Sequence, residues 1–286
     1  STRTVSSAAS DVYKRQACVL SLNTALAQTP SAAPATPPEA AAPEYVPKQG
    51  QQGKDVIWVP TQQALIDRML EMAGLTEQDY LVDLGSGDGR TVITAAKRGA
   101  RAHGIEYNAD LVALSQRTAR AEGVSDKATF EKADIFASDF SKATVVTLFL
   151  LPELNIKLRP ILLDMAPGTR VVSNSFTMDE WEPDQSAGGG PECSSYYCQA
   201  HAWVVPAKLH GNWRLANGEL RLEQTYQKLE GTLLRDGQQH ALSEARIDGR
   251  KVAFTAGGQR YEGELRDGRL VGRVDGGGEW SAQRAS

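Results

Sequence analysis

One glycine-rich turn, in the stretch "YLVDLGSGDGRTVITAAKRGA", constrains the fold more than any other feature of the sequence. The apolar run Tyr80–Leu84 has the length of a buried strand, and the pattern after the turn predicts a helix from about Arg90 to Gly99. A strand, a tight turn and a helix in this order are typical of the first unit of a doubly wound α/β sheet, where the backbone approaches a ligand closely. Glycine suits that approach because it has no side chain. The turn contains three of them in the spacing GxGxG: Gly85, Gly87 and Gly89.

Carboxylates flank this turn and narrow the choice of ligand. The stretch "RAHGIEYN" predicts a second strand that ends at Glu106, where a carboxylate can accept hydrogen bonds from both hydroxyls of a ribose. The dinucleotide fingerprint GxGxxG requires a third glycine where this chain has Arg90. Asp83 and Asp88 would repel a pyrophosphate, whereas Asp83 suits a cationic ammonium group. The pattern therefore disfavours an NAD-dependent oxidoreductase.

The motif "VDLGSGDG" resembles motif I of the class I S-adenosylmethionine-dependent methyltransferases, and the resemblance runs from about residue 56 to residue 206. Three further stretches resemble the fourth, fifth and last strands of that family: "ATVVTLFLLPELN", "PGTRVVSNSF" and "AHAWVVPA". The resemblance implies an α/β fold with a Rossmann-like, doubly wound, seven-stranded methyltransferase sheet. Within the superfamily, "VPT", "DLGSGDGR" and "RVVSNSFTMDEW" look most like the bacterial relatives of the ATP synthase c-subunit lysine methyltransferase family.

The same resemblance implies that S-adenosyl-L-methionine is the cofactor and assigns five residues to it. Gly85 and Gly87 would admit the methionine moiety, and Asp83 would hold its ammonium group. Glu106 would bind the ribose, and Asp134 in "EKADIF" would face the adenine amino group. A second interpretation of Asp134 stays open, because an aspartate after a strand also caps helices.

The segment after the fourth strand bears on the methyl acceptor. Leu151, Pro152 and Glu153 stand where DNA-adenine and glutamine methyltransferases carry an Asn/Asp-Pro-Pro-aromatic motif, which argues against those activities. The resemblance implies a protein lysine amine as acceptor, and a small molecule is the alternative. Leu151, Pro152, Glu153 and Thr61 are candidates for the catalytic pocket, and Trp58 is a further lining candidate. Glu153 can equally be an exposed helix-start residue, and Thr61 and Trp58 can serve capping and packing. No catalytic base is identified, and in-line displacement does not require a covalent enzyme intermediate.

The first 54 residues are not expected to build the core. We interpret residues 1–27 as a non-native lead-in and the remnant of a signal peptide, because a short apolar run follows Lys14 and Arg15 and ends in Ala-Leu-Ala. Residues 28–54 are rich in proline and alanine and are expected to form a disordered linker. These features predict an exported, periplasmic, bacterial protein, with a membrane-tethered or cytoplasmic protein as the alternative. No run approaches the roughly 20 apolar residues of a transmembrane span.

Charge and cysteine content restrict the partners. A net charge of −4 argues against a protein that binds nucleic acid through its overall field. Cys193 and Cys198 lie in a loop rich in Gly, Ser and Tyr, and they can form a disulfide in an oxidising compartment or remain free thiols. They lack a nearby histidine pair, so we expect no metal site there.

The chain is expected to continue from a methyltransferase domain, residues 55–208, into a small antiparallel all-β module, residues 209–286. Half of the 26 glycines lie between residues 211 and 286, where short alternating runs are separated by Asp-Gly and Gly-Gly turns. We predict six to eight strands in a sandwich or small barrel. Its expected core consists of five aromatic residues: Trp213, Tyr226, Phe254, Tyr261 and Trp280.

A second hypothesis gives the chain a different role. S-adenosylmethionine is made from ATP in the cytosol, and an exported domain would meet little of it. The alternative is an exported, non-enzymatic binding protein that combines a methyltransferase-like scaffold with the β module. Asp83, Gly85, Gly87 and Glu106 favour the enzyme, because a binding scaffold without the cofactor does not need them.

Overall fold

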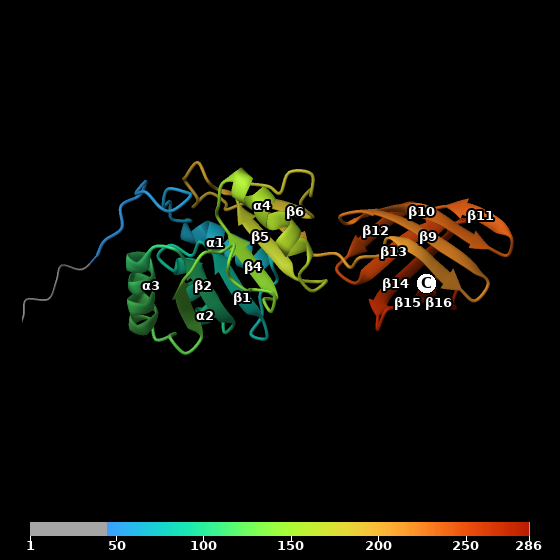
Figure 1. Ribbon diagram of the computed structural model, residues 1–286, viewed down its shortest axis with the longest axis horizontal. Coiled ribbons are helices and arrows are strands. Elements are labelled where there is room, and N and C mark those ends of the chain that lie inside the picture. The colour runs from blue at the N-terminus through green and yellow to red at the C-terminus, as the bar shows by residue number, and fades with distance from the viewer. Residues whose placement is uncertain (1–44, 286) are drawn as a thin grey trace, which may run out of the picture. The chain divides into compact units, whose positions relative to one another are not determined.

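The computed structural model describes residues 45–285, which form an α/β sheet followed by an all-β barrel (Figure 1). The predicted lead-in and signal peptide, residues 1–27, and most of the predicted linker lie outside the described residues. Residues 45–54, predicted to belong to the disordered linker, are placed: Gly50 and Trp58 pair through their backbones, and Gln52 bridges to Ile57. The linker prediction was wrong for these ten residues, because the last five of them, with the four residues that follow, form a small hairpin before the first helix. No helix among residues 45–285 has the length and apolar character needed to cross a membrane.

The first sheet has the seven strands that the resemblance implied, in the order β3-β2-β1-β4-β5-β7-β6. Strands β1 to β5 run parallel, and β7 is antiparallel to both β5 and β6. The order reverses beside β1, because β2 pairs with one edge of β1 and β4 with the other. In such sheets, ligands bind outside the carboxyl ends of the strands at this point. The strand bounds are β1 (Tyr80–Leu84), β2 (Arg101–Glu106), β3 (Ala128–Lys132), β4 (Val145–Leu148), β5 (Arg170–Asn174), β6 (Gln185–Gly188) and β7 (Gln199–Val204).

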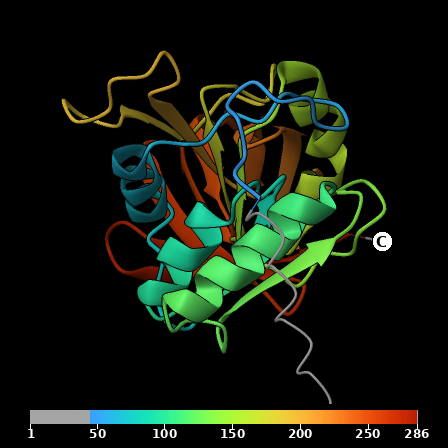
Figure 2. The ribbon, with the colours of Figure 1, turned by 90° about the vertical axis from the view of Figure 1, so that its left-hand side faces the viewer.

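Helices cover both faces of this sheet, and each face has its own hydrophobic core. Successive strand residues point to opposite faces, so Leu81 packs with one core while Val82 and Leu84 pack with the other. The first core includes residues of α1, α2 and α3, and the second includes α4 (Figure 2). This burial on both faces explains why β1 and β4 are almost continuously apolar. The helix bounds are α1 (Gln63–Met72), α2 (Arg90–Lys97), α3 (Ala109–Ala121) and α4 (Pro152–Leu163).

The second sheet is a barrel of antiparallel strands. Its order is β11-β10-β12-β13-β14-β15-β16-β8-β9, and an additional pairing between β9 and β10 closes the ring. Of the two predicted alternatives, sandwich and small barrel, the structure shows the barrel. The module has nine strands where six to eight were predicted: eight close the ring, and β11 pairs with β10 as a short extra strand. The strand bounds are β8 (Gly211–Leu215), β9 (Gly218–Thr225), β10 (Lys228–Arg235), β11 (Gln238–Ala241), β12 (Ser243–Asp248), β13 (Lys251–Ala256), β14 (Gln259–Arg266), β15 (Arg269–Val274) and β16 (Gly278–Arg284).

Four of the five predicted aromatic core residues fill the barrel: Trp213, Phe254, Tyr261 and Trp280 are all buried. The prediction was wrong for Tyr226. This residue lies in the turn between β9 and β10, and its ring stacks at 6.3 Å on Trp181, which belongs to the α/β core. The sequence showed only an aromatic residue in an alternating run, and that pattern does not distinguish a barrel interior from a turn.

Candidate functional site

The glycine turn lies at the end of β1, and its conformation explains its composition. Gly85 and Gly87 have φ values of 79° and 55°, a region that other residues rarely adopt. A Cβ atom added at Gly87 would lie 2.7 Å from Nε1 of Trp58, and one at Gly85 would lie 3.1 Å from Leu150. The turn thus brings bare backbone against the side chains that surround it, and α2 begins directly after it at Arg90.

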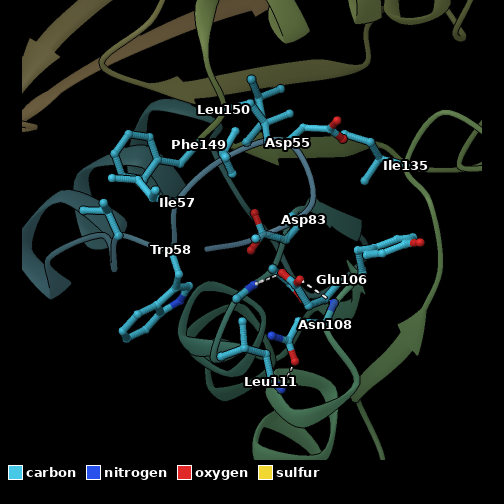
Figure 3. Close-up of a pocket in the computed structure, with 18 of the residues that line it drawn as sticks. Asp55, Ile57, Trp58, Asp83, Glu106, Asn108, Leu111, Ile135, Phe149 and Leu150 are labelled. Atoms are coloured by element: carbon cyan, nitrogen blue, oxygen red, sulfur yellow. Dashed lines mark hydrogen bonds between the residues drawn. The ribbon is translucent and has the colours of Figure 1, made fainter. Parts of the chain in front are cut away.

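Asp83 is a buried carboxylate at the centre of the pocket, with Glu106, Asn108 and Leu111 on one side and Phe149 and Leu150 on the other (Figure 3). It accepts a hydrogen bond of 2.6 Å from the Thr147 hydroxyl. Burial raises the pKa of Asp83 to about 7, the Thr147 hydrogen bond opposes this, and the charges of Glu106 and Asp88 add to it. Within residues 45–285, no basic side chain forms an ion pair with Asp83.

Glu106 links the glycine turn to the end of β2. Its carboxylate accepts hydrogen bonds from the backbone N–H of Gly87 at 2.9 Å and from that of Asn108 at 2.8 Å (Figure 3). Asn108 in turn caps α3 by accepting from the backbone of Asp110. One carboxylate therefore fixes the glycine turn and the start of the next helix together. Each of its oxygens retains a lone pair for a further donor.

Asp134 lies two residues after β3 and also lines the pocket. It accepts hydrogen bonds from Lys54 Nζ at 2.7 Å and from the backbone N–H of Phe136 at 2.9 Å. Both contacts lower the pKa of Asp134, and the hydrogen bond from Lys54 has the larger effect. The Lys54 ammonium also lies 5.2 Å from the ring centre of Tyr107. No sequence pattern pointed to Lys54, which stands in the stretch predicted to be linker.

The pocket has a volume of about 370 Å³, within the range of small-molecule sites. All five predicted cofactor-binding residues line it, so the fold brings together residues spread over 52 positions of the chain: Asp83, Gly85, Gly87, Glu106 and Asp134. Residues 51–61 of the N-terminal hairpin line it as well. No cluster of three His, Cys, Asp or Glu side chains suited to a metal ion exists within the described part of the chain.

The structure divides the candidate catalytic residues into two groups. Thr61 and Leu151 line the pocket, as does Trp58. Thr61 accepts a hydrogen bond from Asn174 and does not cap α1, whose N-cap is the next residue. Pro152 and Glu153 are exposed in the first turn of α4 and are not among the pocket-lining residues, so their place in the catalytic pocket stays a prediction. Glu153 lies in the first turn of α4, which fits the helix-start alternative, and of the first three residues of this helix only Leu154 lines the pocket.

Three aromatic residues that sequence reasoning missed line the same pocket: Phe149, Phe176 and Tyr197. Phe149 follows β4, Phe176 follows β5, and Tyr197 lies in the loop before β7. That loop is closed by a disulfide between Cys193 and Cys198, which decides between the two predicted alternatives. Three single aromatics more than 20 positions apart form no local pattern, and only the sheet topology brings them together.

The residues present fit S-adenosylmethionine. Asp83 is buried without a cation and can meet an ammonium group, and its raised pKa indicates that the carboxylate needs such a partner to ionise at low cost. Gly85 and Gly87 line the pocket with bare backbone, at positions where a Cβ atom would collide with Leu150 and Trp58. Glu106 retains acceptor capacity where the hydroxyls of a ribose would donate.

Known proteins resemble the part of the chain that builds this pocket. The sequence profile of the ANTKMT methyltransferase domain matches residues 83–185, a range that contains all five predicted cofactor-binding residues. A protein from Saccharolobus islandicus named protein-lysine N-methyltransferase is 41% identical over 133 residues, which are 46% of this chain and 83% of that protein. The human lysine N-methyltransferase of the ATP synthase c-subunit is 36% identical over 134 residues, which span 46% of this chain and only 57% of the human protein.

Among solved structures, the chain is similar to one described as an RNA methyltransferase from Salinibacter ruber in complex with S-adenosyl-L-homocysteine. The sequences are 46% identical, and the match covers 53% of this chain and 96% of that chain with a TM-score of 0.49.

The burial of Asp83 predicts a pH-dependent stability of the ligand-free protein. Its folded-state pKa of about 7 lies above the ordinary value of 3.8, so the folded state holds the proton more tightly. Raising the pH from about 4 to about 7 therefore lowers the free energy of unfolding, and this loss of stability is complete above about pH 7. Asp83→Asn removes this contribution, so the stability of the variant relative to the wild type should increase by up to about 4 kcal/mol over that range. Urea denaturation at several pH values measures it.

Asp126→Asn serves as the matched control, because Asp126 is exposed in the turn before β3. Its denaturation profile should follow that of the wild type at every pH. If the Asp83→Asn profile also stayed parallel to that of the wild type, Asp83 would be ionised in the folded protein across the range and our description of its surroundings would be wrong.

Proposed function

Because this chain belongs to the ANTKMT methyltransferase family and is an S-adenosylmethionine-dependent methyltransferase, we propose that its methyl acceptor is the ε-amine of a protein lysine. The observation that carries the proposal is the 41% identity to a protein-lysine N-methyltransferase over 83% of that protein's length. The human enzyme named for lysine methylation of the ATP synthase c-subunit supports the same acceptor class over a smaller share of its length. The comparisons lend no support to a non-enzymatic binding protein.

We propose that the cofactor-binding residues act as the family resemblance implies. Asp83 holds the ammonium group, and Gly85 and Gly87 allow the methionine moiety to lie against the backbone. Glu106 accepts from the ribose hydroxyls with the lone pairs that its two backbone donors leave free. Asp134 faces the adenine amino group, while its other oxygen keeps the contact with Lys54.

When bound, S-adenosylmethionine would supply an electrophilic methyl group for in-line attack by an amine, with S-adenosylhomocysteine as the leaving group. The chain contributes alignment and the exclusion of water, which together account for a large part of catalysis in reactions of this kind. Leu150 and Leu151 present apolar surface at the end of β4, and Trp58 covers the glycine turn. Loss of the lysine proton to water before methyl transfer makes a protein base unnecessary.

The predicted absence of a nucleic-acid partner stays a prediction. The net charge of −4 supports it, because proteins that bind nucleic acid through phosphate contacts present basic surfaces. The test of the lysine proposal should therefore include RNA as the alternative methyl acceptor, so that this prediction is tested as well.

Methyl transfer to protein lysine can be measured with isotopically labelled S-adenosylmethionine. The full chain should label a panel of lysine-containing proteins (histone H3, cytochrome c and serum albumin), and tandem mass spectrometry should locate the methyl groups on lysine. The same proteins with acetylated lysines provide the matched control, because acetylation removes the nucleophilic amine. Labelling of total RNA in place of protein would contradict the proposal.

Glu106→Ala should weaken the binding of S-adenosylhomocysteine at least tenfold, which corresponds to about 1.4 kcal/mol. The substitution removes the acceptor of the ribose hydroxyls and also frees the backbone of Gly87. Titration calorimetry measures the affinity. Glu131→Ala is the control, because this glutamate lies on the neighbouring β3 and its side chain is 62% exposed. An unchanged affinity of Glu106→Ala would show that the ribose binds elsewhere.

We also propose that the chain is exported to the periplasm, with a membrane-tethered or cytoplasmic protein as the alternatives. The bond between Cys193 and Cys198 supports export, because disulfides persist in oxidising compartments. The residues interpreted as a signal peptide lie outside the described residues. Fractionation of bacteria that make the full chain should find it in the periplasm with both cysteines resistant to alkylation. Recovery in the cytosol with alkylated cysteines would refute export.

A further inference from the structure

Three aromatic rings gather in the pocket: those of Phe149, Phe176 and Tyr197. Their centres are 5.3 Å apart for Phe149 and Tyr197, 6.1 Å for Phe176 and Tyr197, and 6.3 Å for Phe149 and Phe176. The first two rings are nearly parallel, at 24°, and the ring of Tyr197 is inclined by about 60° to both. Each side chain is only partly buried, so the cluster keeps accessible ring surface.

This spacing suits an alkylammonium group. With the ring centres 5.3 to 6.3 Å apart, one point beside the cluster can lie within ~6 Å of all three centres, the range of cation–π attraction. Because Phe149 and Phe176 are nearly parallel, such a group faces at most one of these two rings and meets the edge of the other. No basic residue within residues 45–285 fills that position, since the cation–π contacts of the structure involve other rings. The three rings thus offer a place for a cation that does not come from this part of the chain.

The charges of the pocket also favour a cation. Its two basic lining residues are paired, Lys54 with Asp134 at 2.7 Å and Arg90 with Asp88. Asp83 and Glu106 have no ion pair within the described residues. The pocket therefore keeps an excess of acidic side chains, and the aromatic rings line it together with Leu150 and Leu151.

We propose that Phe149, Phe176 and Tyr197 form the acceptor site and hold the ammonium end of lysine against their ring surfaces until it loses its proton. The proposal rests on the proposed lysine acceptor and names the residues that select it. The rings favour a cation over a neutral group of the same shape, and they tolerate added methyl groups because a methylated ammonium presents apolar C–H surface to them. The acceptor is thereby defined as an aliphatic amine.

The loop that carries Tyr197 is anchored at several points. The disulfide between Cys193 and Cys198 closes it, the backbone N–H of Ser194 donates to Gln62 at 2.9 Å, and that of Tyr197 donates to the Ser195 hydroxyl at 3.1 Å. These contacts fix one wall of the acceptor site. The adjacent Tyr196 is 95% exposed and does not line the pocket, so it provides a matched control in the same loop.

The test compares two probes that differ only in charge. One is Nα-acetyl-Nε-trimethyllysine amide, and the other is its neutral analogue with carbon in place of Nε. Titration calorimetry of the full chain, saturated with S-adenosylhomocysteine, measures both affinities. The cationic probe should bind at least about tenfold more tightly. Equal affinities, or no detectable binding of either probe at millimolar concentration, would overturn the proposal.

Three variants test which side chain is responsible for the preference for the cationic probe. Tyr197→Leu should reduce the affinity ratio of the two probes several-fold, because it removes one ring face. Tyr197→Phe should keep the ratio, because the ring rather than the hydroxyl is responsible, and Tyr196→Leu should keep it as well. A Tyr197→Leu variant with the wild-type ratio would overturn the role of this ring. Circular dichroism and the affinity for S-adenosylhomocysteine establish that each variant is folded.

The probe measurement does not depend on turnover, so failures of the two proposals can be separated. Selective binding of the cationic probe without methylation of any protein lysine would uphold the aromatic site and overturn the protein-lysine acceptor. Methylation of protein lysines without charge selectivity would uphold the acceptor and overturn the aromatic site.

Discussion

The arrangement of the pocket depends on one carboxylate placed in an apolar strand. Asp83 lies between the two cores of the α/β sheet, where burial disfavours its charged form and only the Thr147 hydroxyl compensates. A group of this kind lowers stability in the ligand-free protein and gains a favourable partner when a cation binds. The glycine turn directly after it lines the same pocket without side chains of its own, and Glu106 holds that turn in place. The burial of Asp83 thus accounts both for the lower stability of the ligand-free protein and for the binding of a cation.

The N-terminal hairpin extends the pocket beyond the sheet. Trp58 covers the glycine turn, and Lys54 reaches Asp134 on the far side, so residues 51–61 form a wall that none of the strands could supply. Lys54 is exposed and its contacts are short-range surface interactions, which contribute little to the stability of the fold. Their effect is on position, because they tie the hairpin to the residues that follow β3.

Sequence reasoning succeeded where a local pattern carries the physical cause. The apolar run ending in Leu84, the glycines after it and Glu106 at the end of the next strand each have a signature within a few residues, and the structure brings them together. It failed where the cause is tertiary. Phe149, Phe176 and Tyr197 meet only because β4, β5 and β7 are neighbours in the sheet. The alternating pattern around Tyr226 could not show that its ring packs on Trp181. Lys54 was missed because proline-rich composition gives no indication of where the ordered chain begins.

The pocket recognises positive charge in two ways, and the chemistry of the acceptor explains the difference. An ammonium group that only has to be held is best met by a carboxylate such as Asp83. An amine that has to attack carbon must first lose its proton, and a carboxylate beside it would raise the amine pKa and keep the proton bound. Aromatic rings attract the charged group less strongly, and burial among them lowers the pKa of an amine. The three rings therefore hold the amine with a weaker preference for its unreactive, protonated form than a carboxylate in their place would show.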